Sequence, residues 1–190
     1  MKLWLVVSNL NNLLPYLSRP INLIIIFSIV YVFSLPPFGV SVFYYLSFSI
    51  IFYNILTNDN FSKKYIFYFF LFTQIITLSW ITQSFYSGGF GYLFLGIILV
   101  GALSLFIAFL HYSATILILV TFKKKLLQIF LLPLGLSIVE ILKEFIFGGF
   151  PWNPSAIIYY KNIWILKSLP FLGVYGLGLV VHLIVGLMIY

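Results

Sequence analysis

The sequence is dominated by long apolar runs, and the longest, residues 90–122, continues until three consecutive lysines begin at Lys123. Crossing the hydrocarbon core of a bilayer takes about 20 mainly apolar residues. A segment that crosses in contact with lipid must satisfy its backbone hydrogen bonds as a helix or in a closed barrel. The runs show no alternation of polar and apolar residues, so they predict helices. We therefore expect an all-α, polytopic transmembrane helix bundle.

Composition supports a lipid environment. Hydrophobic residues make up 63% of the 190 residues and charged residues 7%, and the mean hydropathy is +1.17. Soluble domains are about 45–50% apolar and about 25% charged. The net charge of +7 is scattered between the apolar runs and forms no stripe that could follow a phosphate backbone, which argues against nucleic acid as a partner.

The order of apolar runs and polar breaks predicts about six spans within a transmembrane domain of residues 21–190. Residues 1–20 are predicted to form a cytoplasmic or interfacial N-terminal segment, in which 3–17 is an interfacial helix or a weak first insertion. The breaks are the double proline at 36–37, the polar loop 59–64, the Ser-Gly-Gly at 87–89, the lysines at 123–125 and the loop 148–168. The predicted spans are 21–35, 40–56, 65–86, one within 90–122, 126–147, and one from 170 that still continues at 190.

Basic residues predict the orientation, because Lys and Arg are retained on the cytoplasmic side of short loops. With the N-terminus inside, seven basic residues face the cytoplasm and two face outward. The seven are Lys2, Arg19, Lys63, Lys64, Lys123, Lys124 and Lys125, and the two are Lys161 and Lys167. The count favours a cytoplasmic N-terminus.

Two acidic residues and one lysine lie within a predicted span. On a helix Glu140 and Glu144 share a face, with Lys143 beside them. Glu140 lies about 5 Å past the middle of its span, at about 1.5 Å rise per residue. An ionisable group at that depth is costly unless it is paired or wet, so it is a candidate functional site. The alternative is a Glu–Lys pair that only orients the helices of the bundle.

The segment that follows this helix is the second candidate site. It reads Gly148-Gly149-Phe150-Pro151-Trp152-Asn153-Pro154. The two glycines are expected to end the helix, and the two prolines to fix the backbone of the return. Trp152 suits a bilayer interface, so an ordinary interfacial turn with an aromatic anchor is the alternative interpretation.

The other polar residues in the spans are weaker candidates. His111 and His182 have no acidic or histidine neighbour at ligand spacing, so we predict no metal site and expect each to be hydrogen-bonded within the bundle. Trp80, with Gln74 and Gln83, is more typical of helix–helix contacts than of a binding site. Close helix packing is the favoured explanation for three glycines: Gly173, Gly176 and Gly178.

The stretch from 132 to 153 carries a resemblance to a known family. Its sequence, LPLGLSIVEILKEFIFGGFPWN, resembles the N-terminal membrane domain of apolipoprotein N-acyltransferases, in which a helix with Glu-x-Leu-Arg is followed by Gly-Phe-Pro-Trp. Lys143 stands where that family has arginine, and the change loses bidentate geometry. Weaker similarities are Pro170 to Gly176, FSLPPFG at 33–39 and the segment at Trp80 to Phe85, so the resemblance covers about 21–190.

The resemblance implies a role in lipoprotein maturation at the bacterial inner membrane. In that family a nitrilase-like domain with a Glu, Lys and Cys triad moves an acyl chain from a phospholipid, through a cysteine thioester, to the N-terminal amine of a diacylglyceryl lipoprotein. The implied partners are the bilayer, the phospholipid donor, the lipoprotein and a separate nitrilase-like domain; no cofactor is implied. The lipid- or substrate-facing candidates are Glu140, Lys143, Gly149, Phe150, Pro151 and Trp152, with Trp80 and Glu144 secondary.

The absence of cysteine shapes the functional expectation. A thioester needs an activated thiolate, and no region of the sequence is polar enough for the nitrilase-like fold, so none of the family's catalytic triad can be carried over to these 190 residues. We expect a truncated or split N-acyltransferase membrane domain without activity alone. The alternatives are a small transporter or channel subunit with an intramembrane Glu–Lys site, and a structural membrane subunit.

Overall fold

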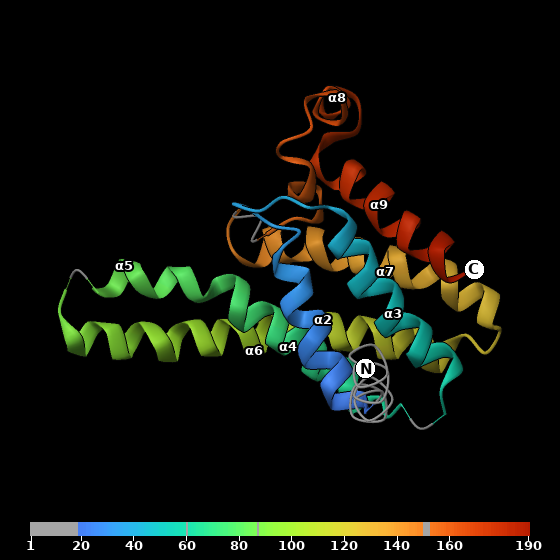
Figure 1. The fold of residues 1–190 in the computed structure, drawn as a ribbon, viewed down its shortest axis with the longest axis horizontal. Helices are drawn as coiled ribbons and strands as arrows, with labels where there is room; N and C mark the ends of the chain where they lie inside the picture. The colour runs from blue at the N-terminus through green and yellow to red at the C-terminus, as the bar shows by residue number, and fades with distance from the viewer. Residues whose placement is uncertain (1–18, 60, 87, 150–152) are drawn as a thin grey trace, which may run out of the picture.

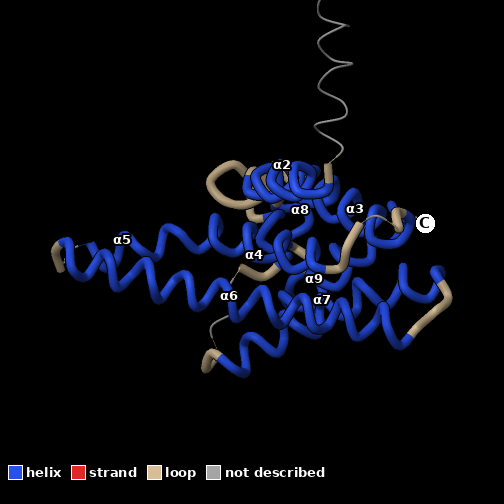
Figure 2. Tube along the Cα trace, turned by 90° about the horizontal axis from the view of Figure 1, so that it is seen from below, coloured by secondary structure: helices blue, strands red, loops and turns tan. Residues whose placement is uncertain are grey.

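The computed structural model describes residues 19–59, 61–86, 88–149 and 153–190. The predicted interfacial segment 3–17 and the three residues Phe150, Pro151 and Trp152 lie outside this part. All regular structure in the described residues is helical, and none of them forms a β-strand (Figures 1 and 2). The predicted all-α membrane fold is confirmed.

Apolar helices occupy all six predicted positions, with ends within three residues of the predicted ones. Two short helices, η2 and α8, lie in the connection before the last of them. The bounds are α2 Pro20–Val32, α3 Val42–Thr57, α4 Lys64–Leu78 continued by η1 Ser79–Ile81 and α5 Thr82–Tyr86, α6 Phe90–Thr121, α7 Lys125–Ile146, η2 Ser155–Tyr159, α8 Ile163–Leu166 and α9 Leu169–Ile189.

Four of these helical segments are long and apolar enough to cross a bilayer: Lys64–Tyr86, Phe90–Thr121, Lys125–Ile146 and Leu169–Ile189. The other two, α2 and α3, have 13 and 16 residues. At about 1.5 Å per residue they reach roughly 20 and 24 Å, short of a hydrocarbon core of about 30 Å.

Aromatic rings fill the centre of the bundle. α4 packs on α2 and α6, α7 packs on α6 and α9, and α3 packs on α2 and α9. Phe48 stacks on Tyr44 with 4.6 Å between ring centroids and meets Phe69 edge-on at 5.4 Å. Aromatic pairs of these geometries each contribute about 0.5–1.5 kcal/mol beyond the area that they bury.

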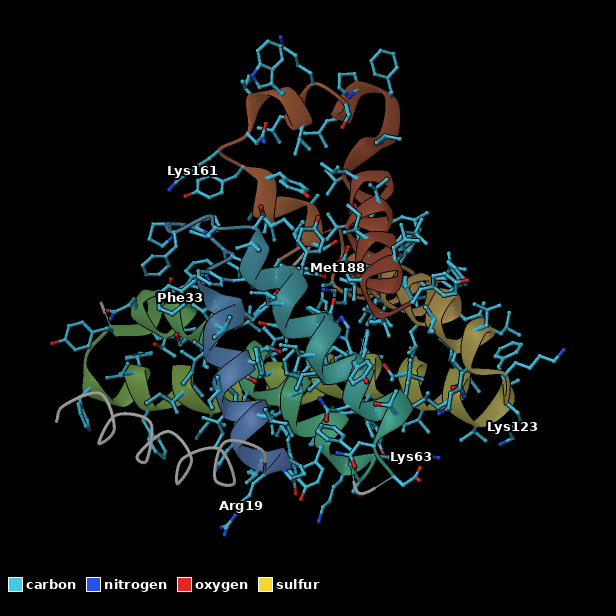
Figure 3. All side chains as sticks on the ribbon, turned by 45° about the vertical axis from the view of Figure 1, so that its right-hand side comes forward. Arg19, Phe33, Lys63, Lys123, Lys161 and Met188 are labelled. Atoms are coloured by element: carbon cyan, nitrogen blue, oxygen red, sulfur yellow. The ribbon has the colours of Figure 1, made fainter. Side chains whose placement is uncertain are left out.

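The segment η2–α8 is tied to the turn between α2 and α3. The hydroxyl of Tyr160 and the Nζ of Lys161 donate to the carbonyl oxygen of Pro37, at 2.7 and 2.9 Å. The hydroxyls of Tyr45 and Tyr159 also hydrogen-bond to each other. The two connections thus form one structured surface at the end of the bundle that carries Lys161 (Figure 3).

The opposite end carries most of the basic residues. Arg19 precedes α2, Lys63 precedes α4, and Lys123 follows α6; Figure 3 shows these three along one side of the molecule, away from Lys161. We call this the lysine-rich end, which comprises Arg19, Lys63, Lys64, Lys123, Lys124 and Lys125. The charge asymmetry predicted from the sequence therefore corresponds to two ends of the folded bundle.

The glycines of α9 serve two purposes. A Cβ on Gly178 would lie 2.8 Å from the Oγ of Ser155, which confirms the packing interpretation there. The packing interpretation is wrong for Gly173, because no atom lies within 4 Å of a Cβ at this position. Its φ of +66° interrupts the helix instead. Gly173 is required by a left-handed backbone conformation that only glycine adopts without strain.

We predict that Gly186→Ala destabilises the packing of α9 on α7. The added Cβ would lie 3.0 Å from the carbonyl oxygen of Ile129 and 3.0 Å from the Cγ of Pro133, so the helix backbones must separate. The expected loss is about 1–2 kcal/mol in the free energy of unfolding, measured by denaturant titration in detergent micelles. Gly101→Ala is the control, since a Cβ there meets nothing within 4 Å. Equal stability of the two variants would contradict the packing.

Candidate functional site

The loop after α7 begins with a left-handed turn. Gly148 and Gly149 have φ of +65° and +93°, and Asn153 has φ of +48°. The amide of Gly149 donates to the carbonyl oxygen of Glu144 at 2.8 Å, which caps the end of the helix. Left-handed conformations are natural for glycine and tolerated by asparagine. The two glycines thus end α7 as predicted.

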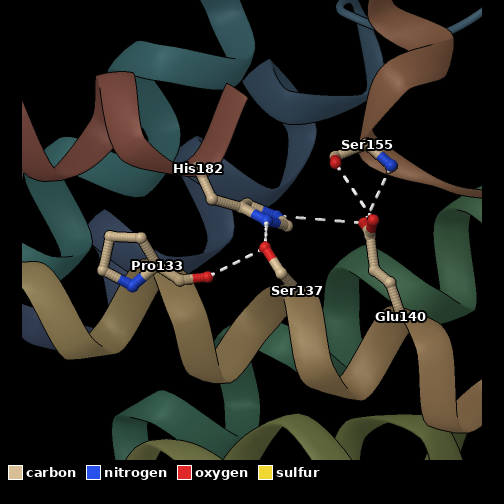
Figure 4. A network of polar contacts seen from close by, with 5 residues as sticks. All are labelled: Pro133, Ser137, Glu140, Ser155 and His182. Atoms are coloured by element: carbon tan, nitrogen blue, oxygen red, sulfur yellow. Dashed lines mark hydrogen bonds and ion pairs between the residues drawn. The ribbon is translucent and has the colours of Figure 1, made fainter. Parts of the chain in front are cut away.

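Glu140 holds this loop from inside the bundle. Its side chain is 5% exposed, and its Oε1 accepts a hydrogen bond from the backbone amide of Ser155 at 2.8 Å. Its Oε2 accepts from the Oγ of Ser155 at 3.1 Å. Hydrogen bonds to a carboxyl group are worth more than neutral ones, about 1.5–3 kcal/mol when the acceptor is charged. Figure 4 shows these contacts, which bind the start of η2 to the middle of α7.

His182 of α9 joins the same cluster. Its Nδ1 lies 2.8 Å from the Oγ of Ser137, and its Nε2 lies 3.8 Å from the Oε1 of Glu140 (Figure 4). The hydroxyl of Ser137 is also within hydrogen-bonding distance of the carbonyl oxygen of Pro133, at 3.1 Å. The predicted hydrogen bonding of the histidines is confirmed for both, since the Nδ1 of His111 lies 2.9 Å from the carbonyl oxygen of Ile107.

The single proton of the Ser137 hydroxyl allows two arrangements of this chain. If it is donated to Pro133, then His182 must donate from Nδ1 to Ser137. If it is donated to His182, then Nε2 carries the imidazole proton and directs it toward Glu140. The second arrangement has the donor order of a serine–histidine–acid triad.

This order of donors does not make Ser137 a catalytic nucleophile, because Ser137, His182 and Glu140 are all buried. The cavity beside Glu140 and His182 has a volume of about 20 Å³, which is room for about one water molecule. An ester or amide substrate needs far more space. The arrangement therefore connects three segments of the chain, α7, η2 and α9, without offering a site for an acyl substrate.

The small internal cavity is lined by several of the buried polar side chains of the bundle. Lys143, 2% exposed, lies in its wall together with Glu140. The structure thus places both residues inside the protein, where neither contacts lipid directly. The side chains around this cavity come from six helices and the loop: Tyr31, Tyr44, Phe48, Phe70, Thr73, Gln74, His111, Leu136, Glu140, Lys143, Asn153 and His182.

The other candidates within the described residues do not line the cavity. Gly149 is exposed, Glu144 is half-buried, and Trp80 is 60% exposed on η1. Phe150, Pro151 and Trp152 lie outside the described residues. In the described part of the chain, no group of three or more His, Cys, Asp or Glu side chains could hold a metal ion.

A comparison of the sequence with known families identifies a match that covers these helices and the loop. A family model described as apolipoprotein N-acyltransferase N-terminal domain matches residues 27–187, from within α2 almost to the end of α9. The chain belongs to this family. No curated protein and no solved structure matches it.

The match to the apolipoprotein N-acyltransferase family extends over the residues of the site. The match includes Glu140, the whole loop of residues 148–154 and His182. The polytopic helical bundle is thus a membrane domain of a lipoprotein N-acyltransferase type. The contacts of Glu140 join the helix and the loop that carried the sequence resemblance into one unit.

Three participants in the cluster were not singled out from the sequence. Ser155 and Ser137 are serines in apolar surroundings, where a hydroxyl commonly bonds to its own helix. Asn153 was visible only as part of the loop motif. Its left-handed φ was not indicated by its neighbours, because a residue directly before proline is biased toward extended conformations.

Proposed function

We propose that this chain is the membrane domain that holds the lipid substrates of a lipoprotein N-acyltransferase. The loop of residues 148–155 would receive the phospholipid acyl donor and the diacylglyceryl lipoprotein at the outer face of the bacterial inner membrane. The lysine-rich end would face the cytoplasm, which agrees with the retention of basic residues on that side. The observation that carries the proposal is the pair of hydrogen bonds from Ser155 to Glu140, which fix this loop to the family's membrane helix.

The proposed division of labour rests on the burial of Glu140 and Lys143, which would support the loop from within, and on the exposure of Gly149. Gly149 would contact lipid together with Phe150, Pro151 and Trp152, which the sequence resemblance places in the same motif. Acyl transfer through a thioester needs a cysteine, and these 190 residues contain none. The thiolate and its Glu and Lys partners would come from a nitrilase-like domain outside these residues.

We predict that the 190-residue chain alone does not acylate a lipoprotein. The test is incubation of the purified chain in phospholipid vesicles with a diacylglyceryl lipopeptide, followed by mass spectrometry for the added acyl mass. An N-acylated product above the level of protein-free vesicles would contradict the prediction.

A second test addresses substrate binding directly. A phospholipid with a photoactivatable group near its glycerol is expected to label residues 148–155 more strongly than the lipid-facing helices. Trp152→Ala should reduce that labelling several-fold. Trp164→Ala is the control, because Trp164 is 77% exposed on α8 and away from the loop. Labelling spread evenly over the apolar helices would show that the loop is not a lipid site.

The transporter alternative predicts a path through the bundle and flux that is lost in Glu140→Gln. The cavity at Glu140 measures only about 20 Å³, and no observation on the described residues extends it to either end of the bundle. Flux measurements in liposomes distinguish this alternative from the lipid-binding function.

A further inference from the structure

One part of the fold is not used by the proposed function. The continuation of α4 through η1 and α5 pairs with the start of α6, and together they leave the bundle as a two-helix arm (Figures 1 and 2). We define the arm as residues 79–86 and 90–100. Its helices pack closely, since a Cβ on Gly96 would lie 2.8 Å from the ring of Phe85.

The length of α6 requires that the arm extends beyond the hydrocarbon core. α6 has 32 residues, or about 48 Å at about 1.5 Å per residue. A tilt of about 40°, the upper end of the usual range, still leaves a span of about 37 Å against a core of about 30 Å. Lys123, Lys124 and Lys125 fix the other end of α6 at a membrane surface, so the excess of about 7 Å or more falls at Phe90.

The arm carries exposed aromatic side chains, with Trp80 near the point where it leaves the bundle and the others nearer its far end. Five of them are more than half exposed, and Phe90 reaches 83%. The indole and phenol rings of Trp80, Tyr86 and Tyr92 combine an apolar body with a polar tip, which suits the layer of headgroups and glycerol at a membrane surface. The phenylalanines add apolar area beside them. The five are Trp80, Tyr86, Phe90, Tyr92 and Phe94.

The distribution of charge indicates whether the arm contacts a lipid surface or a protein partner. Residues 65–122 contain no Asp, Glu, Lys or Arg, so the arm has no charged side chain on any face. A site for protein docking in water has a polar rim around its apolar centre. An uncharged arm with aromatic ends would be poorly solvated in water and well accommodated in the interfacial layer of a bilayer.

We propose that the arm is a lipid-anchoring element whose aromatic end lies in the phospholipid headgroup layer opposite the lysine-rich end. It contacts headgroups and glycerol there, and it fixes the depth of α6 in the bilayer. This inference rests only on the chain being a membrane domain, and it holds for either orientation in the membrane.

The absence of cysteine makes the test clean, because a single introduced cysteine can be labelled without background. Spin labels are attached to Phe90→Cys, to Phe94→Cys, and to two controls in lipid nanodiscs. Phe109→Cys reports the middle of α6, where Phe109 is 57% exposed, and Lys124→Cys reports the aqueous surface. The readout is the ratio of collisions with oxygen, which enriches in lipid, to collisions with a water-soluble nickel complex.

The label at Phe90 is expected to give a ratio between those of the two controls. The label at Phe94, one helical turn further in, should lie roughly 5 Å deeper. If Phe90 is as open to nickel as Lys124, the arm stands clear of the lipid and the proposal is wrong. If the label is shielded from both reagents, a protein or a second copy covers the arm, and the proposal is equally wrong. Tyr92→Cys repeats the measurement at a second position should Phe90→Cys not fold.

Discussion

Glu140→Ala is expected to lower the free energy of unfolding by about 3–5 kcal/mol, the loss typical of removing one partner from a buried polar pair. The substitution removes both acceptors of Ser155, at 2.8 and 3.1 Å, and the acidic group that shares a cavity with Lys143. Because the loop is held by these contacts, we expect it to become accessible to protease. Denaturant titration in micelles measures the first effect, and limited proteolysis near residues 148–155 measures the second.

Glu144→Ala is the matched control for that experiment. It removes a carboxylate from the same helix one turn further on, where the side chain is half-buried. We expect a change of about 0.5 kcal/mol or less, as for substitutions away from buried networks. Glu140→Gln should fall between the two variants, because the amide keeps one acceptor oxygen for Ser155. Equal losses for Glu140→Ala and Glu144→Ala would mean that the cluster does not stabilise the bundle.

The fold followed from the sequence because a bilayer restricts what an apolar segment can do. A run such as 90–122 must be helical, and polar or glycine-rich breaks must lie at its ends, so the predicted limits agree with α6 at Phe90–Thr121. The end of α2 shows the largest difference, Val32 against the predicted residue 35. Apolar residues continue past Val32, and hydropathy does not indicate that the backbone turns there.

The site followed from the sequence only in part. Glu140 and the loop were adjacent in sequence and could be associated by a motif, whereas His182 lies 42 residues beyond Glu140. No local pattern reports that an isolated histidine in α9 faces a carboxyl group in α7. The same limit applies to Glu140 and Lys143, because helical periodicity does not give the neighbours that bury these two side chains.

The glycine at the centre of the cluster supplies a test of its geometry. Gly178→Ala is expected to lose about 2 kcal/mol of stability, because the new Cβ would lie 2.8 Å from the Oγ of Ser155 and 2.9 Å from the Oε2 of Glu140. Neither oxygen can retreat without breaking the hydrogen bond between them. Alanine otherwise favours a helix over glycine by up to about 1 kcal/mol, so a net loss must come from the collision.

A double variant locates that collision. Ser155→Ala removes the hydroxyl that the Cβ would strike, while the backbone amide still donates to Glu140. Gly178→Ala combined with Ser155→Ala should therefore be more stable than the sum of the single losses predicts, by about 1 kcal/mol. Gly101→Ala, in open space on α6, should lose nothing and combine additively with Ser155→Ala. Additive losses in both pairs would show that Gly178 and Ser155 do not touch, and that the loop is held to α9 by other contacts.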